Sequence, residues 1–436
     1  MVTANEGARG TDDSKRYTRR VVDDELDELM AGLAAVALEG PKAVGKTATA
    51  LRRAATVHHL DDTLERSIAQ ADPGRLLAGR PPILIDEWQQ VPESFDRVRR
   101  AVDEGAPPGS FLLTGSASPT VPPTHSGAGR IVQVRLRPMT LMERGLDTPT
   151  VSLGELLEGR EAPIDGQTGV GLEDYVSEVL ASGFPGLRGL SDRLARAQLD
   201  GYIARIIERD FEELGRKVRR PRALRGWMAA YAAATATTAS YEKIRDAATS
   251  GQGEKPSRAT TQPYRELLER LWILDPVPAW LPTRNRMARV AAPPKHHLTD
   301  PALAARLLDV DAATLLHPRG RARAMNPEGT LLGALFESLI TLCVRVYAQA
   351  TEAHTAHLRT WSGDREVDLI VERGSKVLAI EVKLGGTIGA RDVRNLLWLR
   401  DALGDGLTDA VILTTGPAAY RRTDGIAVVP ATLLGP

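Results

Sequence analysis

Residues 40 to 47 read Gly40-Pro41-Lys42-Ala43-Val44-Gly45-Lys46-Thr47, a complete G-x-x-x-x-G-K-[ST] phosphate loop. An apolar run, 34 to 38, leads into the loop, and a helix-prone segment, 48 to 54, follows it. In such a loop the backbone N–H groups close around phosphate oxygens, and the N-terminus of the following helix favours anions. Lys46 is expected to reach the outer phosphates, and the Thr47 hydroxyl to ligate Mg²⁺. The pattern therefore predicts that residues 40 to 47 bind a nucleoside triphosphate.

A pair of carboxylates, Asp86 and Glu87, follows the strand candidate 83 to 85, forty residues beyond Lys46. This is the spacing and setting of a Walker B site. Asp86 would hold Mg²⁺, usually through water, and Glu87 would orient and deprotonate the water that attacks the γ-phosphate. The alternative is an acidic strand end that faces solvent. We expect hydrolysis, and we expect ATP because no [NT]-K-x-D signature for guanine follows in the sequence.

Two further residues are candidates for the nucleotide site. Thr114 follows the strand candidate 111 to 113, where it or Ser116 could sense the γ-phosphate; a plain turn is the alternative. Arg130, before the strand candidate 131 to 136, is a candidate arginine finger, although such residues are often only solvated. An arginine finger supplied in trans would require a homo-oligomer.

Composition restricts the class of protein. The chain has 436 residues, 42% of them apolar, so we expect two or three folded domains. Lys plus Arg and Asp plus Glu each number 56, so no overall charge draws the chain to nucleic acid or a membrane surface. The single cysteine, Cys343, allows no intrachain disulfide, which favours a reducing cytoplasm. No apolar run approaches the roughly 20 residues that span a bilayer, so no membrane segment is expected.

The pattern of residues divides the chain into five segments. Residues 1–20 are polar and are expected to form a disordered leader. Residues 21–147 alternate short apolar strand candidates with charged helical stretches, which predicts a parallel α/β sheet. A linker rich in Gly, Glu and Pro, 148–171, leads to a helical region, 172–295. A second α/β domain is expected over 296–436.

The last domain contains a second cluster of candidate catalytic residues. Glu381 and Lys383 belong to an E-x-K triplet on a strand candidate, so they share one face. A turn between two strands would bring Asp368 beside Glu381, and Glu337 on the preceding helix candidate would add a third carboxylate. Asp368 and Glu381 would hold a divalent metal, and Lys383 would position or activate a water. The alternative is a charged edge of an ordinary α/β domain.

Together these motifs resemble prokaryotic AAA-type P-loop ATPases whose C-terminal domain of unknown function is similar to PD-(D/E)XK nucleases. The resemblance covers most of the chain. It rests on the phosphate loop and on residues 84 to 87, 113 to 116, 182 to 185, 207 to 210 and 365 to 383. It implies an α/β fold with an AAA-type parallel sheet, a helical winged-helix-like middle and a C-terminal restriction-endonuclease-like domain. It predicts architecture better than purpose, because the role of this family is mostly unestablished.

The middle region departs from an ordinary DNA-reading helix pair. Its loop contains Gly251, Gln252 and Gly253, and its second helix, expected near 257 to 268, contains Pro263. Basic residues crowd a stretch nearby and are candidates for phosphate contacts, unless they form only a solvated helix face. They are Arg216, Lys217, Arg219, Arg220, Arg222 and Arg225.

The sequence thus supports an ATPase that acts through Lys46, Thr47, Asp86 and Glu87 and whose nucleotide state moves helical and nuclease-like domains that engage DNA. Two alternatives stay open. In one, the chain is a nucleotide-switched regulatory or partner-binding protein with a catalytically inactive nuclease-like domain. In the other, the nuclease is active and ATP licenses it.

Overall fold

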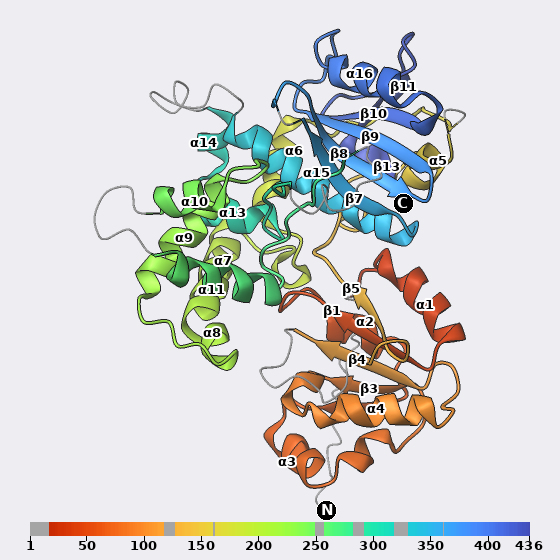
Figure 1. The fold of residues 1–436 in the computed structure, drawn as a ribbon, viewed down its shortest axis with the longest axis vertical. Helices are drawn as coiled ribbons and strands as arrows, with labels where there is room; N and C mark the ends of the chain where they lie inside the picture. Colours follow the sequence, from red (N-terminus) through yellow and green to blue (C-terminus); the bar gives the residue numbers. More distant parts are fainter. Residues whose placement is uncertain are drawn as a thin grey trace, which may run out of the picture.

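The computed structural model describes residues 17–116, 127–159, 162–248, 257–281, 292–317, 330–360 and 362–436. Figure 1 shows an N-terminal sheet with its helices, a helical middle region and a C-terminal sheet. Of the expected leader, residues 1–16 lie outside the described residues. Its last residues pack on the N-terminal part: Arg20 is 4% exposed, and its Nε lies 3.0 Å from Glu143 Oε1.

The N-terminal sheet is parallel and has the strand order β2-β3-β4-β1-β5. Its strands are β1 (Ala35–Glu39), β2 (Thr56–His59), β3 (Ile83–Asp86), β4 (Phe111–Gly115) and β5 (Val132–Arg135). The helices α1 (Val22–Gly32), α2 (Lys46–Leu51), α3 (Thr63–Ala71) and α4 (Glu93–Asp103) accompany them. The predicted parallel α/β sheet is confirmed. Strand β2 was not predicted, because its four residues include a single apolar one and are all only partly buried.

Helices cover this sheet on both faces, which explains why its central strands are almost entirely apolar. Val36 and Leu38 of β1 share a cluster with α1, whereas Ala35 and Ala37 share a cluster with α3 and α4. Successive side chains of a strand point to opposite faces of the sheet. Because helices cover both faces, all four residues are buried at 0% exposure. The carboxyl ends of the parallel strands therefore meet at one edge of a rigid sheet, where the phosphate loop leaves β1.

The middle region is helical. It contains α6 (Leu172–Ala181), α7 (Asp192–Arg205), the π-helical segment η5 (Ile206–Asp210), α8 (Phe211–Glu213), α9 (Pro221–Ala233), α10 (Tyr241–Ala247) and α11 (Arg258–Arg270). After α11, bridges join Leu274 to Leu298 and Val277 to Lys295. The helices α13 (Pro301–Leu307) and α14 (Ala312–Leu316) follow, and α13 packs on α6, α7 and α9. The sequence placed these two helices with the last domain; in the structure they pack on the middle region and also on α15 (Leu331–Ala350).

The C-terminal sheet is mixed and has the order β11-β12-β10-β9-β8-β7. The long helix α15 (Leu331–Ala350) precedes β7 (His354–Arg359), β8 (Glu366–Arg373) and β9 (Lys376–Lys383), which are antiparallel neighbours. Then come α16 (Arg394–Leu403), β10 (Asp409–Thr414), β11 (Tyr420–Arg421) and β12 (Ala427–Pro430). Strand β10 is parallel to β9 and to β12.

The segment expected to be a linker has structure of its own. Strand β6 (Val151–Ser152) pairs with the final strand, β13 (Leu434–Gly435), and α5 (Leu153–Glu158) packs on α15 and β9. Its apolar residues Leu153, Leu156 and Leu157 are fully buried. Much of the segment 148–171 therefore belongs to the C-terminal domain, because its three leucines lie on one side of a short helix.

Helix α15 is long and apolar enough to cross a membrane by length and composition. However, 72% of that stretch is buried inside the protein. It packs against α6, α13, β7 and β9, which is the setting of a core helix. No span was expected from the sequence because no uninterrupted apolar run approaches roughly 20 residues; this helix contains Glu337 and Arg345.

The three parts meet at Asp275, which follows α11. Its carboxylate lies 2.9 Å from Arg135 NH1, at the end of β5, and 3.1 Å from Arg137 Nε, two residues after it. Arg345 of α15 approaches it to 2.8 Å. Burial alone would raise the pKa of Asp275, but the three guanidinium groups hold this pKa far below its usual value. One carboxylate thus joins the N-terminal, middle and C-terminal parts.

Candidate functional site

The phosphate loop connects β1 to α2 in the conformation that its glycines allow. Gly45, before the first residue of α2, has φ 105°, and a Cβ on Gly40 would lie 2.2 Å from the carbonyl oxygen of Leu136. Lys46 Nζ donates to the carbonyl oxygens of Gly40 at 2.9 Å and Pro41 at 2.8 Å. Burial lowers the pKa of Lys46 to about 8, against the opposing effect of Glu87 and Asp86.

Asp86, at the end of β3, lies across from the start of α2. Thr47 Oγ1 donates to Asp86 Oδ1 at 2.8 Å, and Thr114 Oγ1, from the neighbouring strand β4, donates to the same oxygen. The two residues predicted to hold Mg²⁺ are therefore in contact. A hydroxyl and a carboxylate are hard oxygen donors of the kind that Mg²⁺ prefers, so this pair fits the ion.

Glu87 has a strained backbone and a held carboxylate. Its φ of 55° lies in the left-handed region, which costs a residue with a side chain about 1 kcal/mol or more. Ser116 Oγ donates to Glu87 Oε1 at 2.8 Å, and Gln89 Nε2 donates to Oε2. The Glu87 N–H donates to Thr114 Oγ1 at 3.3 Å. Thr114 therefore touches both acidic residues and fixes their relative positions.

The structure adds a histidine to this edge. His59 ends β2, and its Nδ1 lies 3.3 Å from Asp86 Oδ2. Ligand atoms of His59, Asp61 and Asp86 lie within 4.8 Å of one another. His59 was not predicted because no strand was predicted at β2. Its position at the carboxyl end of a strand is the signal that could have revealed it.

Arg130 lies away from the phosphate loop. Its Nε lies 2.8 Å from Asp103 Oδ1 on α4, and it precedes β5. In the parallel pair of β1 and β5, Val132 lies opposite Val36. Arg130, two residues before Val132, is therefore level with the start of β1, whereas the phosphate loop follows the end of β1. The structure therefore does not bring Arg130 to the nucleotide site of its own chain.

The phosphate loop also contacts the middle region. Lys42 Nζ lies 2.7 Å from Asp210 Oδ1 and 2.9 Å from Glu213 Oε2. The Tyr202 hydroxyl donates to the carbonyl oxygen of Lys42 at 3.2 Å. A Cβ on Gly45 would lie 3.5 Å from Pro185 Cγ, so the turn before α7 also packs on the loop. The segments 182 to 185 and 207 to 210, on which the resemblance partly rests, thus each contribute a contact to the loop.

The second predicted cluster forms on β8, β9 and α15. Asp368 Oδ2 accepts a hydrogen bond from the Val382 N–H at 2.9 Å, and Lys383 Nζ donates to Glu381 Oε2 at 2.8 Å. Burial and the neighbouring charge of Asp368 raise the pKa of Glu381 well above its usual value. Within the described part of the chain, Glu381 Oε1 is buried and has no hydrogen-bond partner.

An unpredicted cation, Lys295, lies inside this cluster at 0% exposure. Its Nζ lies 2.8 Å from Glu337 Oε1, 3.0 Å from Glu366 Oε1 and 3.1 Å from Asp368 Oδ1. Its backbone is tied to the middle region, because the N–H donates to the Val277 carbonyl oxygen at 2.9 Å. No local pattern around residue 295 signals this long-range contact.

The charges of the cluster nearly balance without a metal ion. Burial and the charge of Asp368 raise the pKa of Glu337 to about 8. Asp368 is also buried, but Lys295 and Lys383 lower its pKa to about 2. Burial alone would lower the pKa of Lys295. The surrounding carboxylates, however, raise this pKa well above its usual value. The donor set suits a cation, and an ammonium already fills that role.

Comparisons with known families divide the chain in the same three parts. Residues 34–144 match a family described as AAA domain. Residues 172–314 and 332–434 match two domains of unknown function, DUF8612 and DUF4143. The contact between the loop and Asp86, together with the first match, supports a P-loop ATPase domain and nucleotide binding. The matches to DUF8612 and DUF4143 name no activity.

Curated relatives include an uncharacterized protein, Mb2031c, of Mycobacterium bovis and an uncharacterized protein, Rv2008c, of Mycobacterium tuberculosis. Each is 25% identical over 405 residues, covering 91% of this chain and 80% of the relative. A solved Walker-type ATPase of Pyrococcus abyssi, PABY2304, is 16% identical and covers 65% of this chain and 94% of its own. Its TM-score is 0.37, too low to support a conclusion about this chain.

Proposed function

We propose that this chain binds Mg-ATP and hydrolyses it, and that its nucleotide state controls how the middle region and the C-terminal domain engage DNA. The carrying observation is the hydrogen bond of 2.8 Å between Thr47 Oγ1 and Asp86 Oδ1, beside a buried Lys46. Thr47 and Asp86 would hold Mg²⁺, which supplies charge neutralisation on the phosphates when bound. Lys46 would exchange its loop carbonyls for phosphate oxygens.

Glu87 is the candidate that orients the attacking water. Its carboxylate is held by Ser116 and Gln89 next to Asp86, so it needs little rearrangement to accept a proton. Thr114 donates to Asp86 and accepts from the Glu87 N–H, and so keeps metal ligand and base in a fixed relation. Lys42 and Asp210 provide the contact through which the loop would move the middle region.

The test uses two variants with different expected phenotypes. Lys46→Ala should abolish nucleotide binding or hydrolysis, whereas Glu87→Gln should bind ATP and lose turnover. Glu104→Gln, an exposed acidic residue after α4, is the control and should behave as the wild type. Binding is measured with a fluorescent ATP analogue and turnover by phosphate release. Normal hydrolysis by Glu87→Gln would refute the assignment.

A second candidate function, favoured by Lys295, is a nucleotide-switched regulatory or partner-binding protein with an inactive nuclease-like domain. The succession α15, β7, β8, β9, α16, β10 and the position of Asp368 and Glu381 support a nuclease-like domain. The Lys295 ammonium, however, occupies the centre of the carboxylates at 2.8 to 3.1 Å. A buried ammonium there opposes a divalent ion at the same place.

The two candidates differ in DNA cleavage. The purified protein would be incubated with plasmid and single-stranded DNA in Mg²⁺ or Mn²⁺, with and without ATP. Glu381→Ala is the control variant. Cleavage that this variant loses would establish an active nuclease, and a requirement for ATP would show that the nucleotide licenses it. Intact DNA under every condition would favour the inactive domain.

A further inference from the structure

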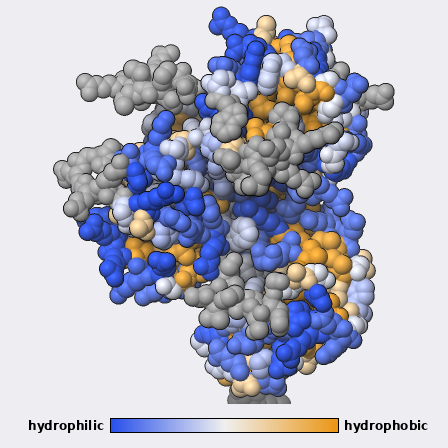
Figure 2. Space-filling view, in the orientation of Figure 1, coloured by the Kyte–Doolittle hydropathy of each residue, from blue (hydrophilic) through white to orange (hydrophobic). Residues whose placement is uncertain are grey.

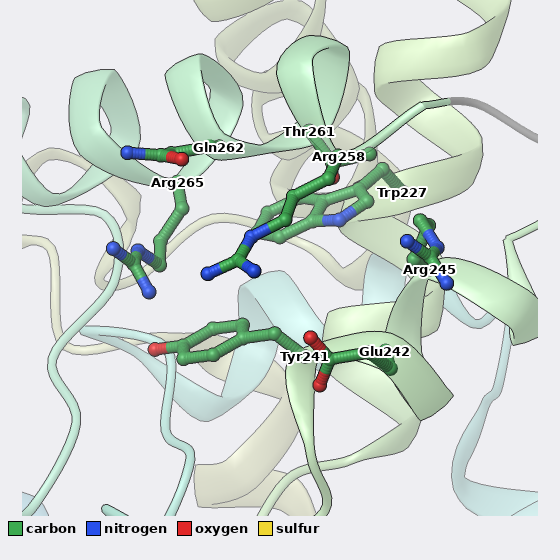
Figure 3. A pocket seen from close by; sticks show the side chains of 8 residues that line it. All are labelled: Trp227, Tyr241, Glu242, Arg245, Arg258, Thr261, Gln262 and Arg265. Carbon is green, nitrogen blue, oxygen red and sulfur yellow. The ribbon is translucent and has the colours of Figure 1, made fainter.

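Two surface hollows lie on opposite sides of helix α11. The first, about 150 Å³, is lined by Arg245, Arg258 and Arg265 with Tyr241, Trp227 and Glu242 (Figure 3). The second, about 180 Å³, is lined by Arg216, Lys217 and Arg219 with Tyr264 and Phe211. Positions 258, 262 and 265 of α11 face the first hollow, and positions 260, 263 and 267 face the second. The helix thus stands as a ridge between two basic depressions.

Most of these cations lack acidic partners within the described residues. The side chains of Arg216, Lys217, Arg219 and Arg258 make no ion pair or hydrogen bond there. Arg265 stacks over the Tyr241 ring at 4.6 Å, and its Nε lies 3.8 Å from Glu269 Oε1. Arg245 NH2 lies 3.3 Å from Asp246 Oδ1. Figure 3 shows the Arg258 guanidinium above the Tyr241 ring with its end open to the hollow. Glu242 is the acidic side chain in the lining of the first hollow.

The charge of this surface is set by a long stretch without acidic residues. Between Glu213 and Glu242 the chain has no Asp or Glu and contains the six basic residues Arg216, Lys217, Arg219, Arg220, Arg222 and Arg225. All six are exposed. In a chain whose total charge is zero, this is a local positive field, and Figure 2 shows the outer face of the middle region as largely hydrophilic. Such a field attracts a polyanion.

The dimensions select the kind of polyanion. An α-helix with side chains is about 10–12 Å across, which matches the roughly 12 Å width of the major groove of duplex DNA. Phosphate backbones border that groove on both sides, as the two hollows border α11. Guanidinium groups bind phosphate oxygens in a bidentate manner. Duplex RNA fits less well because its major groove is deep and narrow.

We propose that α11 enters the major groove of duplex DNA and that phosphates of the two backbones lie in the two basic hollows. This inference rests on the proposed function in one respect: it names the surface with which the middle region engages DNA. Binding is largely independent of base sequence. Ala259 and Thr260 are short, and the Gln262 Nε2 donates to Glu266 Oε1 at 2.8 Å, which leaves few groups for base readout.

The experiment measures binding of the full chain to a labelled DNA duplex of about 30 base pairs, roughly three helical turns, by fluorescence anisotropy. One variant, Arg216→Ala/Lys217→Ala/Arg219→Ala, empties the second hollow of charge, and Arg258→Ala weakens the first. The matched control, Arg97→Ala/Arg100→Ala, removes two exposed cations from α4. Affinity is followed between about 0.05 and 0.2 M salt, where phosphate contacts determine the slope.

The wild type and the control should bind with the same steep salt dependence. Each lost phosphate contact should reduce the slope of log K against log salt by about 0.9 and weaken binding about tenfold near 0.1 M salt. Both hollow variants should therefore bind more weakly, the triple variant most. Equal binding by the hollow variants and the control would overturn the proposal. So would equal affinity for duplex RNA, or binding of an acidic peptide with no binding of duplex DNA.

ATP hydrolysis measured on the same samples separates this inference from the proposed function. Hollow variants that lose DNA binding but keep basal hydrolysis would support both. A wild type that hydrolyses ATP but binds no duplex would overturn only the inference about α11. A wild type that binds duplex through the hollows without hydrolysing ATP would overturn only the ATPase assignment.

Discussion

The ammonium of Lys42, inside the phosphate loop, lies 2.7 Å from the carboxylate of Asp210 in the middle region. Asp210 ends the π-helical segment η5, and such segments occur often at functional sites. A bound triphosphate would bring several negative charges beside the same loop. It would therefore compete with Asp210 for the Lys42 ammonium, and under the proposed function this competition would loosen the middle region.

Asp210→Asn should strengthen ATP binding and weaken the response of the middle region to ATP. Burial raises the pKa of Asp210. Burial alone would lower the pKa of Lys42, but Asp210 and Glu213 raise it overall. The cost of removing both charges from water therefore offsets part of their attraction. We therefore expect a pair worth about 1 kcal/mol, or roughly fivefold in Kd for ATP. Hydrogen exchange of α7 to α9 with and without ATP should show a smaller difference in the variant.

Glu213→Gln is the matched control, since the Glu213 side chain contacts the same ammonium but is 53% exposed. It should change the Kd for ATP much less than Asp210→Asn does. If both variants respond to ATP as the wild type does, Lys42 and Asp210 do not couple the loop to the middle region.

His59→Ala should raise the Mg²⁺ concentration needed for half-maximal hydrolysis by about tenfold, with little change in the rate at saturation. The reason is that His59 Nδ1, 3.3 Å from Asp86 Oδ2, helps to orient a metal-binding carboxylate. His58→Ala is the control, because His58 faces Glu65 at 3.4 Å instead. A Mg²⁺ titration of the ATPase rate checks the prediction. Equal shifts in the two variants would assign His59 a structural role only.

The parts of this site that could be predicted are those carried by local sequence. The loop around Lys46 has its own pattern, and Asp86 follows an apolar strand at the usual distance. Once parallel strands are assumed, Asp86 and Thr114 must meet at one edge, as they do. The fold of the N-terminal part followed for the same reason, because buried parallel strands appear as apolar runs.

The remaining contacts could not be predicted because they join residues far apart in the chain. Lys42 meets Asp210, and Lys295 meets Glu337 and Asp368, without any spacing that marks these pairs. The boundary expected at 296 rested on local pattern, whereas the short helix α13 packs both on α6, α7 and α9, which precede it by many residues, and on α15, which follows it. Tertiary packing decides which domain such a helix joins, and the local sequence pattern carries no information about that packing.

Lys295→Met should destabilise the protein by about 3–5 kcal/mol, because it leaves buried carboxylates without their cation. Lys376→Met is the control: its side chain is 38% exposed and its partner Glu158 is more exposed still, so this variant should lose little stability. Urea unfolding measures both losses. A loss for Lys295→Met no larger than that for Lys376→Met would show that the ammonium does not hold the cluster together.

Lys295→Met should also gain an affinity for Mn²⁺ that the wild type lacks, since the carboxylates around residue 295 would be free for a divalent ion. The comparison is made in an Asp86→Asn background, which removes a ligand from the predicted Mg²⁺ site. Thermal unfolding should then shift upward with Mn²⁺ only when Lys295 is replaced. An equal shift with Lys295 present would mean that the cluster takes a metal beside the ammonium.

Asp275→Asn should be among the most destabilising single substitutions, at about 3–5 kcal/mol, because it leaves Arg135, Arg137 and Arg345 buried together without an anion. The folded pKa of Asp275 lies far below its unfolded value of about 3.9. A depressed pKa contributes stability that is fully present above the unfolded pKa and is lost as pH falls through the folded pKa. The difference in unfolding free energy between wild type and variant should thus stay constant from about pH 8 to pH 5 and shrink below about pH 4.

Asp103→Asn is the control, because Asp103 forms a surface pair with Arg130 and its loss should cost at most about 1 kcal/mol. Urea unfolding measures both variants. A similarly small loss for Asp275→Asn would show that the junction of the three parts does not depend on this carboxylate.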